Sequence, residues 1–123
     1  MPEKSITISL PWPPTVNTYW RRHGHVIHLS NRGRRYGEAV KAIVRQELPN
    51  VRLPDEVGVL IELWPPDRRK WDVDNRAKAV LDALTKAKLW RDDSQVRDLR
   101  IVDRLLIVKG GACKVTIYPW RTK

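Results

Sequence analysis

Apolar and other residues alternate along two stretches of the chain with the two-residue period of a β-strand. From residue 57 to residue 64, valine, isoleucine or leucine occupies every second position, and Pro65-Pro66 follow. Residues 5–10 alternate in the same way before a proline-rich run at residues 11–14, and prolines cannot donate to a strand ladder. Both stretches are therefore predicted to be strands. Further strands are predicted over residues 26–29, 99–108 and 114–118, the last two forming a hairpin through Gly110-Gly111.

Two stretches between these strands repeat their apolar residues with the period of a helix. Ser30 is a candidate N-cap for a helix that runs to about Leu48. A second helix is predicted from Asn75 to Leu89, with Asp74 as its N-cap. The resulting order β-α-β-α-β-β predicts an α/β or α+β fold, with a mixed four-stranded sheet and two main helices. A chain of 123 residues suits a single domain over residues 1–123.

The charge of the chain indicates a polyanionic partner. Lys and Arg number 24 against 14 Asp and Glu, which gives a formal net charge of +10. Nucleic acid is favoured over a membrane, because no apolar run approaches the ~20 residues of a spanning helix and no signal peptide is recognised. A basic surface that serves only solubility is the plain alternative. Cys113 is the one cysteine, so we expect a buried, inert thiol and a cytoplasmic location.

A group of aspartates stands out against this basic background. Asp72 and Asp74 are two residues apart, and in extended backbone such positions face the same side at roughly 6.5–7 Å. Asp93 follows the second predicted helix, and it can join them only if the loop doubles back. Carboxylates are hard oxygen ligands of the kind that Mg²⁺ binds. The alternative is an ordinary helix N-cap beside a solvent-exposed loop acid.

Cations surround the aspartates. Lys78 lies four residues after Asp74 on the same helix face, where its ammonium would stabilise charge on a phosphate. Equally, it would form a surface ion pair with Asp74 or Asp82 that contributes about 0.3–0.5 kcal/mol. A basic run directly before the acids, Arg68-Arg69-Lys70, suits contact with a nucleic-acid backbone or a solvent-exposed loop.

Together these residues resemble the RusA-type Holliday junction resolvases, small dimeric endodeoxyribonucleases that phages and prophages often carry. The resemblance covers nearly the whole chain. It begins at Pro11 to Arg21, is densest over Pro66 to Asn75, continues through Lys78 and Asp82-Ala83-Leu84, and ends with Asp92-Asp93 and the Lys109-Gly110-Gly111 turn. Two departures stand out. Trp71 occupies a position where a basic residue often precedes the first aspartate, and Lys88 occupies one where the helix usually ends with glycine.

The resemblance implies three aspartates that hold Mg²⁺ and a nearby lysine. Matched residue by residue, these fall on Asp72, Asp74, Asp93 and Lys78. It also implies a homodimer that binds a four-way DNA junction and nicks two strands symmetrically, in DNA recombination and repair. No membrane and no nucleotide cofactor are expected.

The sequence therefore predicts a Mg²⁺-dependent, structure-selective endonuclease, with catalysis by the three aspartates and Lys78. The residues predicted to contact DNA are Asn17, Arg21, Arg68, Arg69, Lys70 and Arg76. Two alternatives stay open at this point. One is a nuclease of the PD-(D/E)xK class, although no E-x-K or D-x-K element follows at the usual place. The other is a non-catalytic DNA-binding protein.

Overall fold

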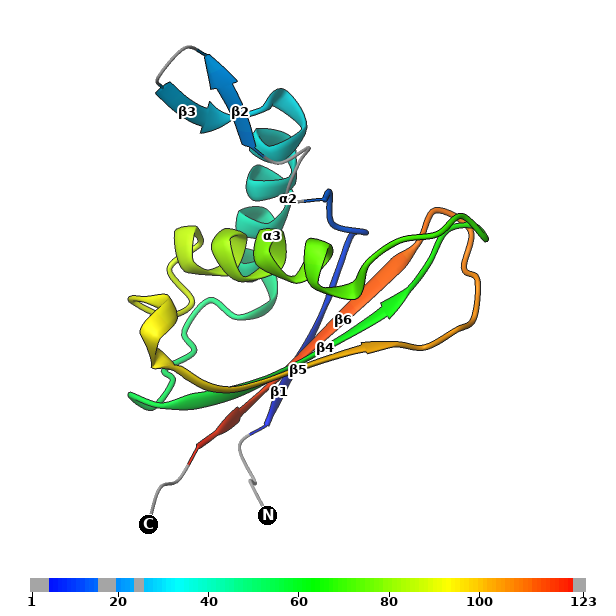
Figure 1. Cartoon of the computed structure of the whole chain (residues 1–123). Helices are drawn as coiled ribbons and strands as arrows, with labels where there is room; N and C mark the ends of the chain where they lie inside the picture. The colour runs from blue at the N-terminus through cyan, green and yellow to red at the C-terminus, as the bar shows by residue number, and fades with distance from the viewer. Residues whose placement is uncertain (1–4, 16–19, 24–25, 121–123) are drawn as a thin grey trace.

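A computed structural model describes residues 5–15, 20–23 and 26–120 (Figure 1). Two helices cover one face of a four-stranded sheet, as the order β-α-β-α-β-β predicted. The strands and helices are β1 (Ile6–Leu10), β2 (Trp20–His23), β3 (Val26–Leu29), α2 (Asn31–Glu47), β4 (Val57–Trp64), α3 (Val73–Lys86), the 3₁₀ turn η1 (Asp93–Gln95), β5 (Val96–Asp103) and β6 (Ala112–Pro119).

The sheet is mixed, with strand order β1-β6-β4-β5. Strand β6 pairs antiparallel with both β1 and β4, whereas β5 pairs parallel with β4. The alternation that predicted β4 from residue 57 to residue 64 matches its bounds. Val57, Val59, Ile61 and Leu63 are fully buried because they face the helices from an inner strand.

The predicted hairpin between the last two strands is wrong. Strand β4 lies between β5 and β6, so the two are not neighbours in the sheet. Strand β5, predicted over residues 99–108, ends at Asp103 and does not reach Val108, and Leu105 beyond it has a left-handed φ of 61°. The connecting segment crosses the end of β4 instead, where the Val108 N–H donates to the Pro65 carbonyl at 2.9 Å.

Helix α2 agrees with its prediction. Ser30 is the N-cap, and its hydroxyl oxygen accepts a hydrogen bond from the Gly33 N–H at 2.9 Å. The helix ends at Glu47, with Leu48 as its C-cap. Its apolar side, which includes Tyr36, Val40 and Val44, is buried against the sheet and α3.

Helix α3 begins and ends earlier than the predicted range from Asn75 to Leu89. Asp72 is its N-cap residue, and Asp74, which the sequence predicted as the cap, lies in the first turn. The helix stops at Lys86, where Lys88 turns the chain with a φ of 68°. The Leu89 N–H donates to the Leu84 carbonyl, and the Lys88 N–H to the Thr85 carbonyl. These bonds form a Schellman motif, a common helix ending.

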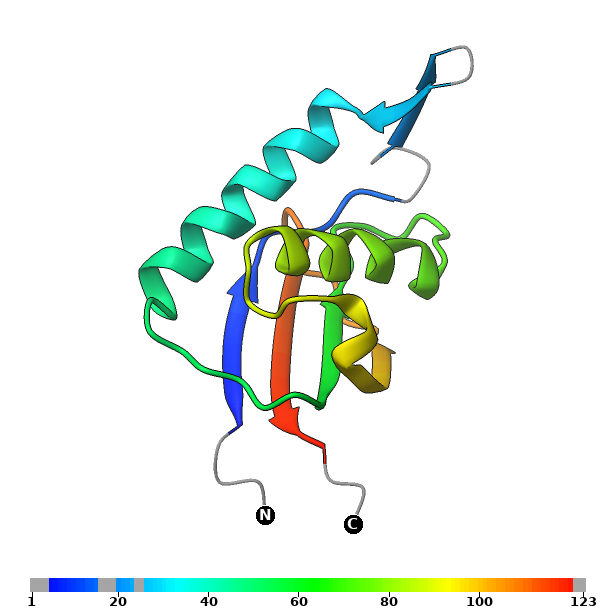
Figure 2. The same cartoon turned by 90° about the vertical axis from the view of Figure 1, so that its left-hand side faces the viewer.

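The figures show how these elements place α3. Helix α3 runs across the sheet on the same face as the long α2, and η1 lies beside it (Figures 1 and 2). Strands β2 and β3 form a separate hairpin at the start of α2. The prediction of a short strand at residues 26–29 is confirmed, whereas β2 was not predicted because Trp20–His23 shows no apolar alternation. In the described part of the chain, no helix is both long and apolar enough to cross a membrane.

Candidate active site

Four polar side chains line one pocket between α3 and β5. Its volume is about 250 Å³. Three of these side chains, Asp74, Lys78 and Asp82, come from α3, and Asp93 comes from η1. The rest of the lining is apolar: Ala77, Leu81, Leu99 and Ile101. Apolar surroundings lower the local dielectric, so these carboxylates attract a cation more strongly than they would in bulk water.

The helical period explains why the three α3 residues share the pocket. They occupy positions i, i+4 and i+8, which lie on one side of a helix. The prediction that Asp74 and Lys78 share a face is confirmed, because both line this pocket. Asp82 also pairs with Lys86 one turn further on, with Oδ2 and Nζ 3.5 Å apart. Acids and lysines therefore alternate along this side of α3.

Asp93 reaches the pocket because the chain doubles back after α3. Its carboxylate accepts a hydrogen bond from the Thr85 hydroxyl, in the last turn of the helix. The indole N–H of Trp90 donates to the same Thr85 oxygen at 2.5 Å, and Trp90 is only 4% exposed. The loop between α3 and η1 is thus anchored in the core immediately before the acid.

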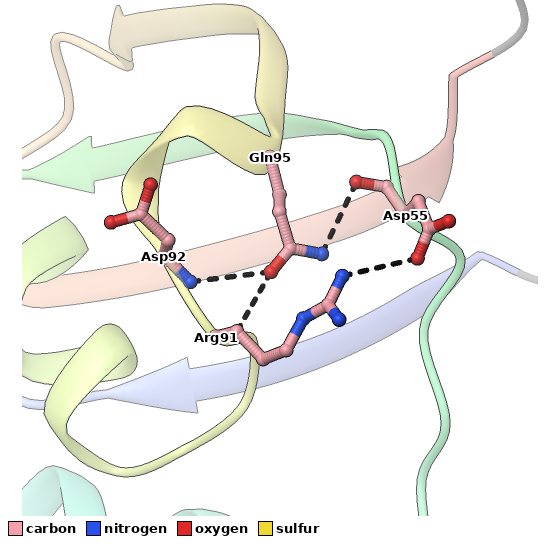
Figure 3. A network of polar contacts seen from close by, with 4 residues as sticks. All are labelled: Asp55, Arg91, Asp92 and Gln95. Atoms are coloured by element: carbon pink, nitrogen blue, oxygen red, sulfur yellow. Dashed lines mark hydrogen bonds and ion pairs between the residues drawn. The ribbon is translucent and has the colours of Figure 1, made fainter.

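A second set of contacts ties η1 and the residues before it to Asp55, just before β4 (Figure 3). Gln95 Oε1 accepts hydrogen bonds from the Arg91 and Asp92 N–H groups at 2.8 and 3.2 Å, and its Nε2 donates to the Asp55 carbonyl at 3.1 Å. Arg91 adds an ion pair with Asp55 at 3.2 Å. The Asp92 carboxylate accepts from the Ser94 N–H at 3.1 Å, which completes a capping box with Gln95. Hydrogen bonds from Ser94 also lower the pKa of Asp92.

Asp72 is not among the residues that line the pocket. It is the N-cap of α3 with φ −103° and ψ 132°, and its carboxylate accepts a 3.3 Å hydrogen bond from the Asn75 side-chain amide. The expectation that Asp72 and Asp74 both lie in extended backbone is wrong, because the helix already begins at Val73. Asp72 is the non-helical cap and Asp74 lies in the first turn, so the two-residue alternation of extended backbone does not apply to this pair.

The aspartates therefore share a region without forming a tight cluster. Asp74 lies in the first turn of α3, whereas Asp93 is hydrogen-bonded to Thr85 in the last turn, so the two acids are held near opposite ends of this helix. Within the described residues, no group of three or more His, Cys, Asp or Glu side chains is arranged to hold a metal ion. An ion in this pocket would thus have few direct protein ligands.

The basic run before α3 is exposed, and one of its members is paired. The side chains of Arg68 and Lys70 are open to solvent. Arg69 grips Asp67 through two hydrogen bonds, at 3.2 Å from Nε and 2.9 Å from Nη2. That hydrogen-bonded guanidinium lowers the pKa of the Asp67 carboxyl. Because the pair is exposed, it contributes little to stability and does not prevent Arg69 from exchanging partners.

Arg76 is the one half-buried member of the predicted DNA-contacting set whose side chain the structure describes. Its Nη1 donates to the Pro13 carbonyl at 2.6 Å, and its guanidinium carbon lies 5.0 Å from the centre of the Trp12 ring. Burial lowers its pKa. Trp71 packs edge-on against Trp12 with the ring centres 5.2 Å apart. Asn17 and the side chain of Arg21 lie outside the described residues.

Comparison with known proteins identifies the family. The model of the endodeoxyribonuclease RusA family matches residues 11–118. This chain belongs to the RusA family. It is 42% identical over 113 residues to proteins named crossover junction endodeoxyribonuclease RusA from Shigella sonnei strain Ss046 and Escherichia coli strain K12, covering 92% of this chain and 93% of each relative. A relative of the same name from Enterobacteria phage 82 is 43% identical over 110 residues, covering 89% of this chain and 91% of its own.

Two residues at this candidate site of the RusA-family chain were not singled out in the sequence. Asp82 was considered only as an ion-pair partner, although the i, i+4, i+8 spacing from Asp74 placed it on the same face. Thr85 gave no signal, because a threonine in a helix usually bonds its own backbone, and its hydroxyl does lie 3.0 Å from the Leu81 carbonyl. Its contact with Asp93 depends on the loop that follows.

Proposed function

We propose that this RusA-family chain is a Mg²⁺-dependent, structure-selective endodeoxyribonuclease, and that it resolves four-way (Holliday) DNA junctions by paired symmetric nicks. Such an enzyme acts in DNA recombination and repair. The observation that carries the proposal is the pocket shared by Asp74, Lys78 and Asp93 on a chain of net charge +10. The names of the relatives support a junction as substrate, since each is called a crossover junction endodeoxyribonuclease.

The chemistry of the pocket suits Mg²⁺. This ion prefers hard oxygen ligands, keeps several waters, and is commonly bound through one or two carboxylates plus substrate phosphate. Asp74 and Asp93 supply such oxygens in the pocket, and the family resemblance implies Asp72, the N-cap residue of α3, as a third ligand. The lack of a three-ligand group among the described residues is compatible with that coordination. When bound, the metal would activate water and neutralise charge that develops on the phosphate.

The protein groups then have separate tasks. Asp74 and Asp93 place negative charge at the pocket, and Asp72 adds its charge at the start of α3, so these acids favour the cation and repel a phosphate that arrives without it. Lys78 lines the same pocket, where its ammonium would stabilise the extra negative charge of the transition state. The apolar residues between them limit the number of competing waters.

Binding of the junction is assigned to the cations around this pocket. Arg68 and Lys70 are exposed immediately before α3, and Arg69 is available by exchange from Asp67. Asn17, Arg21 and Arg76 complete the proposed contact set. Such contacts position the DNA backbone without reading its sequence, which suits an enzyme selective for DNA shape.

The active unit is proposed to be a homodimer. Two symmetric nicks require two sites, and a two-fold dimer supplies them in matching orientation. The segment that connects β5 to β6 along the chain is apolar and supports an association surface. Its residues Leu105, Leu106, Ile107 and Val108 are 81%, 66%, 48% and 38% exposed. The double change of Leu105 and Leu106 to aspartate should leave a monomer by light scattering.

A cleavage assay tests the proposal. Wild-type protein is mixed with a synthetic four-way junction or with linear duplex of the same sequences, with Mg²⁺ or with EDTA. We expect paired nicks in the junction alone, and only with Mg²⁺. Tight junction binding without any cleavage would instead support a non-catalytic DNA-binding protein, and equal cutting of linear duplex would contradict junction selectivity.

A further inference from the structure

We propose that Thr85 is a positioning residue for Asp93, and that Trp90 sets the direction of its hydroxyl. The three side chains form one hydrogen-bonded chain, from the Trp90 indole N–H through the Thr85 hydroxyl to the Asp93 carboxylate. This inference rests on the proposed function, because it concerns how Asp93 presents itself to a cation in the pocket.

The direction of these hydrogen bonds follows from the donors and acceptors that the three side chains offer. An indole N–H can only donate, so the Thr85 oxygen accepts from Trp90 at 2.5 Å. An ionised carboxylate can only accept, so the hydroxyl proton is directed to Asp93. The Leu81 carbonyl, 3.0 Å from the same oxygen, is the longer contact, and its oxygen carries no full charge. Donation to the carboxylate is therefore preferred.

The burial of Trp90 makes this arrangement rigid. Trp90 is 4% exposed and follows Leu89, which is 7% exposed, so both side chains belong to the core. Thr85 is fixed on α3 by the helix itself. Because Thr85 bonds both the buried indole of Trp90 and the exposed carboxylate of Asp93, it holds that carboxylate in a fixed position relative to the core. Asp93 itself is exposed, so without this contact its side chain would be free to rotate.

The contact also leaves Asp93 able to bind a cation. Thr85 engages Oδ1 of Asp93, a residue that lines the pocket, and this hydrogen bond leaves Oδ2 available to a cation. Removal of a group that hydrogen-bonds a metal ligand without contacting the metal commonly changes metal affinity or activity by about 10–100-fold. Thr85 occupies that kind of position. It is therefore expected to set the affinity of the pocket for its ion.

Two substitutions at residue 85 separate this role from simple packing. Thr85→Val keeps the shape of the side chain but removes the hydroxyl, whereas Thr85→Ser keeps the hydroxyl. Mn²⁺ serves as the probe, and its binding is followed without DNA by paramagnetic broadening of amide signals from α3 and η1. The Trp90 indole N–H signal, assigned with Trp90→Phe, reports the first hydrogen bond directly.

We expect Thr85→Val to weaken Mn²⁺ binding by about 10-fold and to move the Trp90 indole N–H signal upfield. The melting temperature of this variant is measured as a control for folding. Thr85→Ser should restore both values toward those of the wild type. Unchanged or tighter Mn²⁺ binding by Thr85→Val would overturn the inference. Wild-type protein that binds Mn²⁺ in this pocket but does not cut junctions would contradict the proposed function alone. Wild-type protein that binds no Mn²⁺ without DNA would overturn the inference, and the cleavage assay would then decide the proposed function separately.

Discussion

Two acids of the candidate site, Asp74 and Asp93, are supported in different ways. Asp74 lies in the first turn of α3, a helix whose opposite side is buried in the core, and Lys78 and Asp82 follow it at regular spacing. Asp93 lies on a short 3₁₀ turn that side-chain hydrogen bonds hold in place, chiefly the one from Thr85 to Asp93 and the one from Gln95 to the Asp55 carbonyl. The position of the first acid depends on a regular helix, whereas that of the second depends on a few specific hydrogen bonds. We call Asp74, Lys78 and Asp82 the helix-borne half of the site, and Asp93 with η1 the loop-borne half. Substitutions elsewhere in the chain should displace the loop-borne half more readily than the helix-borne half.

The largest expected effect treats the two acids alike. Asp74→Asn and Asp93→Asn each keep the size of the side chain but remove its charge. Loss of a group that only supports a metal ligand costs up to about 100-fold in metal affinity or activity, so loss of the ligand's own charge should reduce Mg²⁺-dependent junction cleavage by more than about 100-fold. Junction affinity should hold or rise, because repulsion of phosphate is reduced. Cleavage and gel-shift assays on the same variants measure both quantities, and near wild-type cleavage by either variant would remove that residue from the site.

Lys78 tests whether the helix-borne half carries catalytic charge as well as metal ligands. Lys78→Ala should slow single-turnover cleavage at saturating protein by about 100-fold, with little change in junction affinity. Arg68→Ala is the matched cation outside the pocket, and it should instead weaken binding and lower the salt-dependence slope by about 0.9. Should Lys78→Ala weaken binding as Arg68→Ala does, without slowing bound complexes, Lys78 only positions DNA.

Gln95 tests the dependence of the loop-borne half on its anchors. Gln95→Ala removes the hydrogen bonds that tie η1 to Asp55 and to the chain before Asp92 (Figure 3). We expect a loss of about 1 kcal/mol in stability and faster amide exchange in residues 91–95, because a capping box is lost. Exchange in the first turns of α3 should stay as in the wild type. Equal acceleration in both regions would contradict the separation between the two supports.

The smallest expected effect concerns Lys88, which lies in the turn between α3 and η1 and has a left-handed φ of 68°. Glycine adopts this conformation without steric cost, so Lys88→Gly should raise the free energy of unfolding by roughly 0.5–1 kcal/mol in urea denaturation. Lys86→Gly is the control, and it should lower stability by about 1 kcal/mol because residue 86 is helical. A destabilised Lys88→Gly protein would indicate that the lysine side chain makes a contact that outweighs the strain.

The same contrast explains how much of this protein could be predicted from its sequence. Periodicity was sufficient for β4, α2 and the shared face of Asp74 and Lys78, because each depends on neighbours a few residues away. The resemblance to RusA-type resolvases was confirmed by the family match. The start of α3 at Val73 was missed, because Asp72 and Asp74 are both acceptable N-caps by residue type.

Features that depend on distant segments were not predictable in this way. A glycine pair before the last strand suggested a hairpin, but the parallel pairing of β5 with β4 placed β4 between the last two strands. The return of Asp93 to α3 required the Schellman turn at Lys88 and the burial of Trp90. Neither event has a local signature strong enough to fix where a side chain ends up in space.

The central claim is that a divalent cation binds in the pocket between α3 and β5. Crystals of the wild-type protein grown with Mn²⁺ in place of Mg²⁺ test it directly, because anomalous scattering locates the ion without assumptions about its ligands. We expect a peak in this pocket, with at least one carboxylate oxygen of Asp74 or Asp93 among its ligands, and no such peak in Asp93→Asn crystals. An ion bound only elsewhere, or an empty pocket at saturating Mn²⁺, would contradict the account.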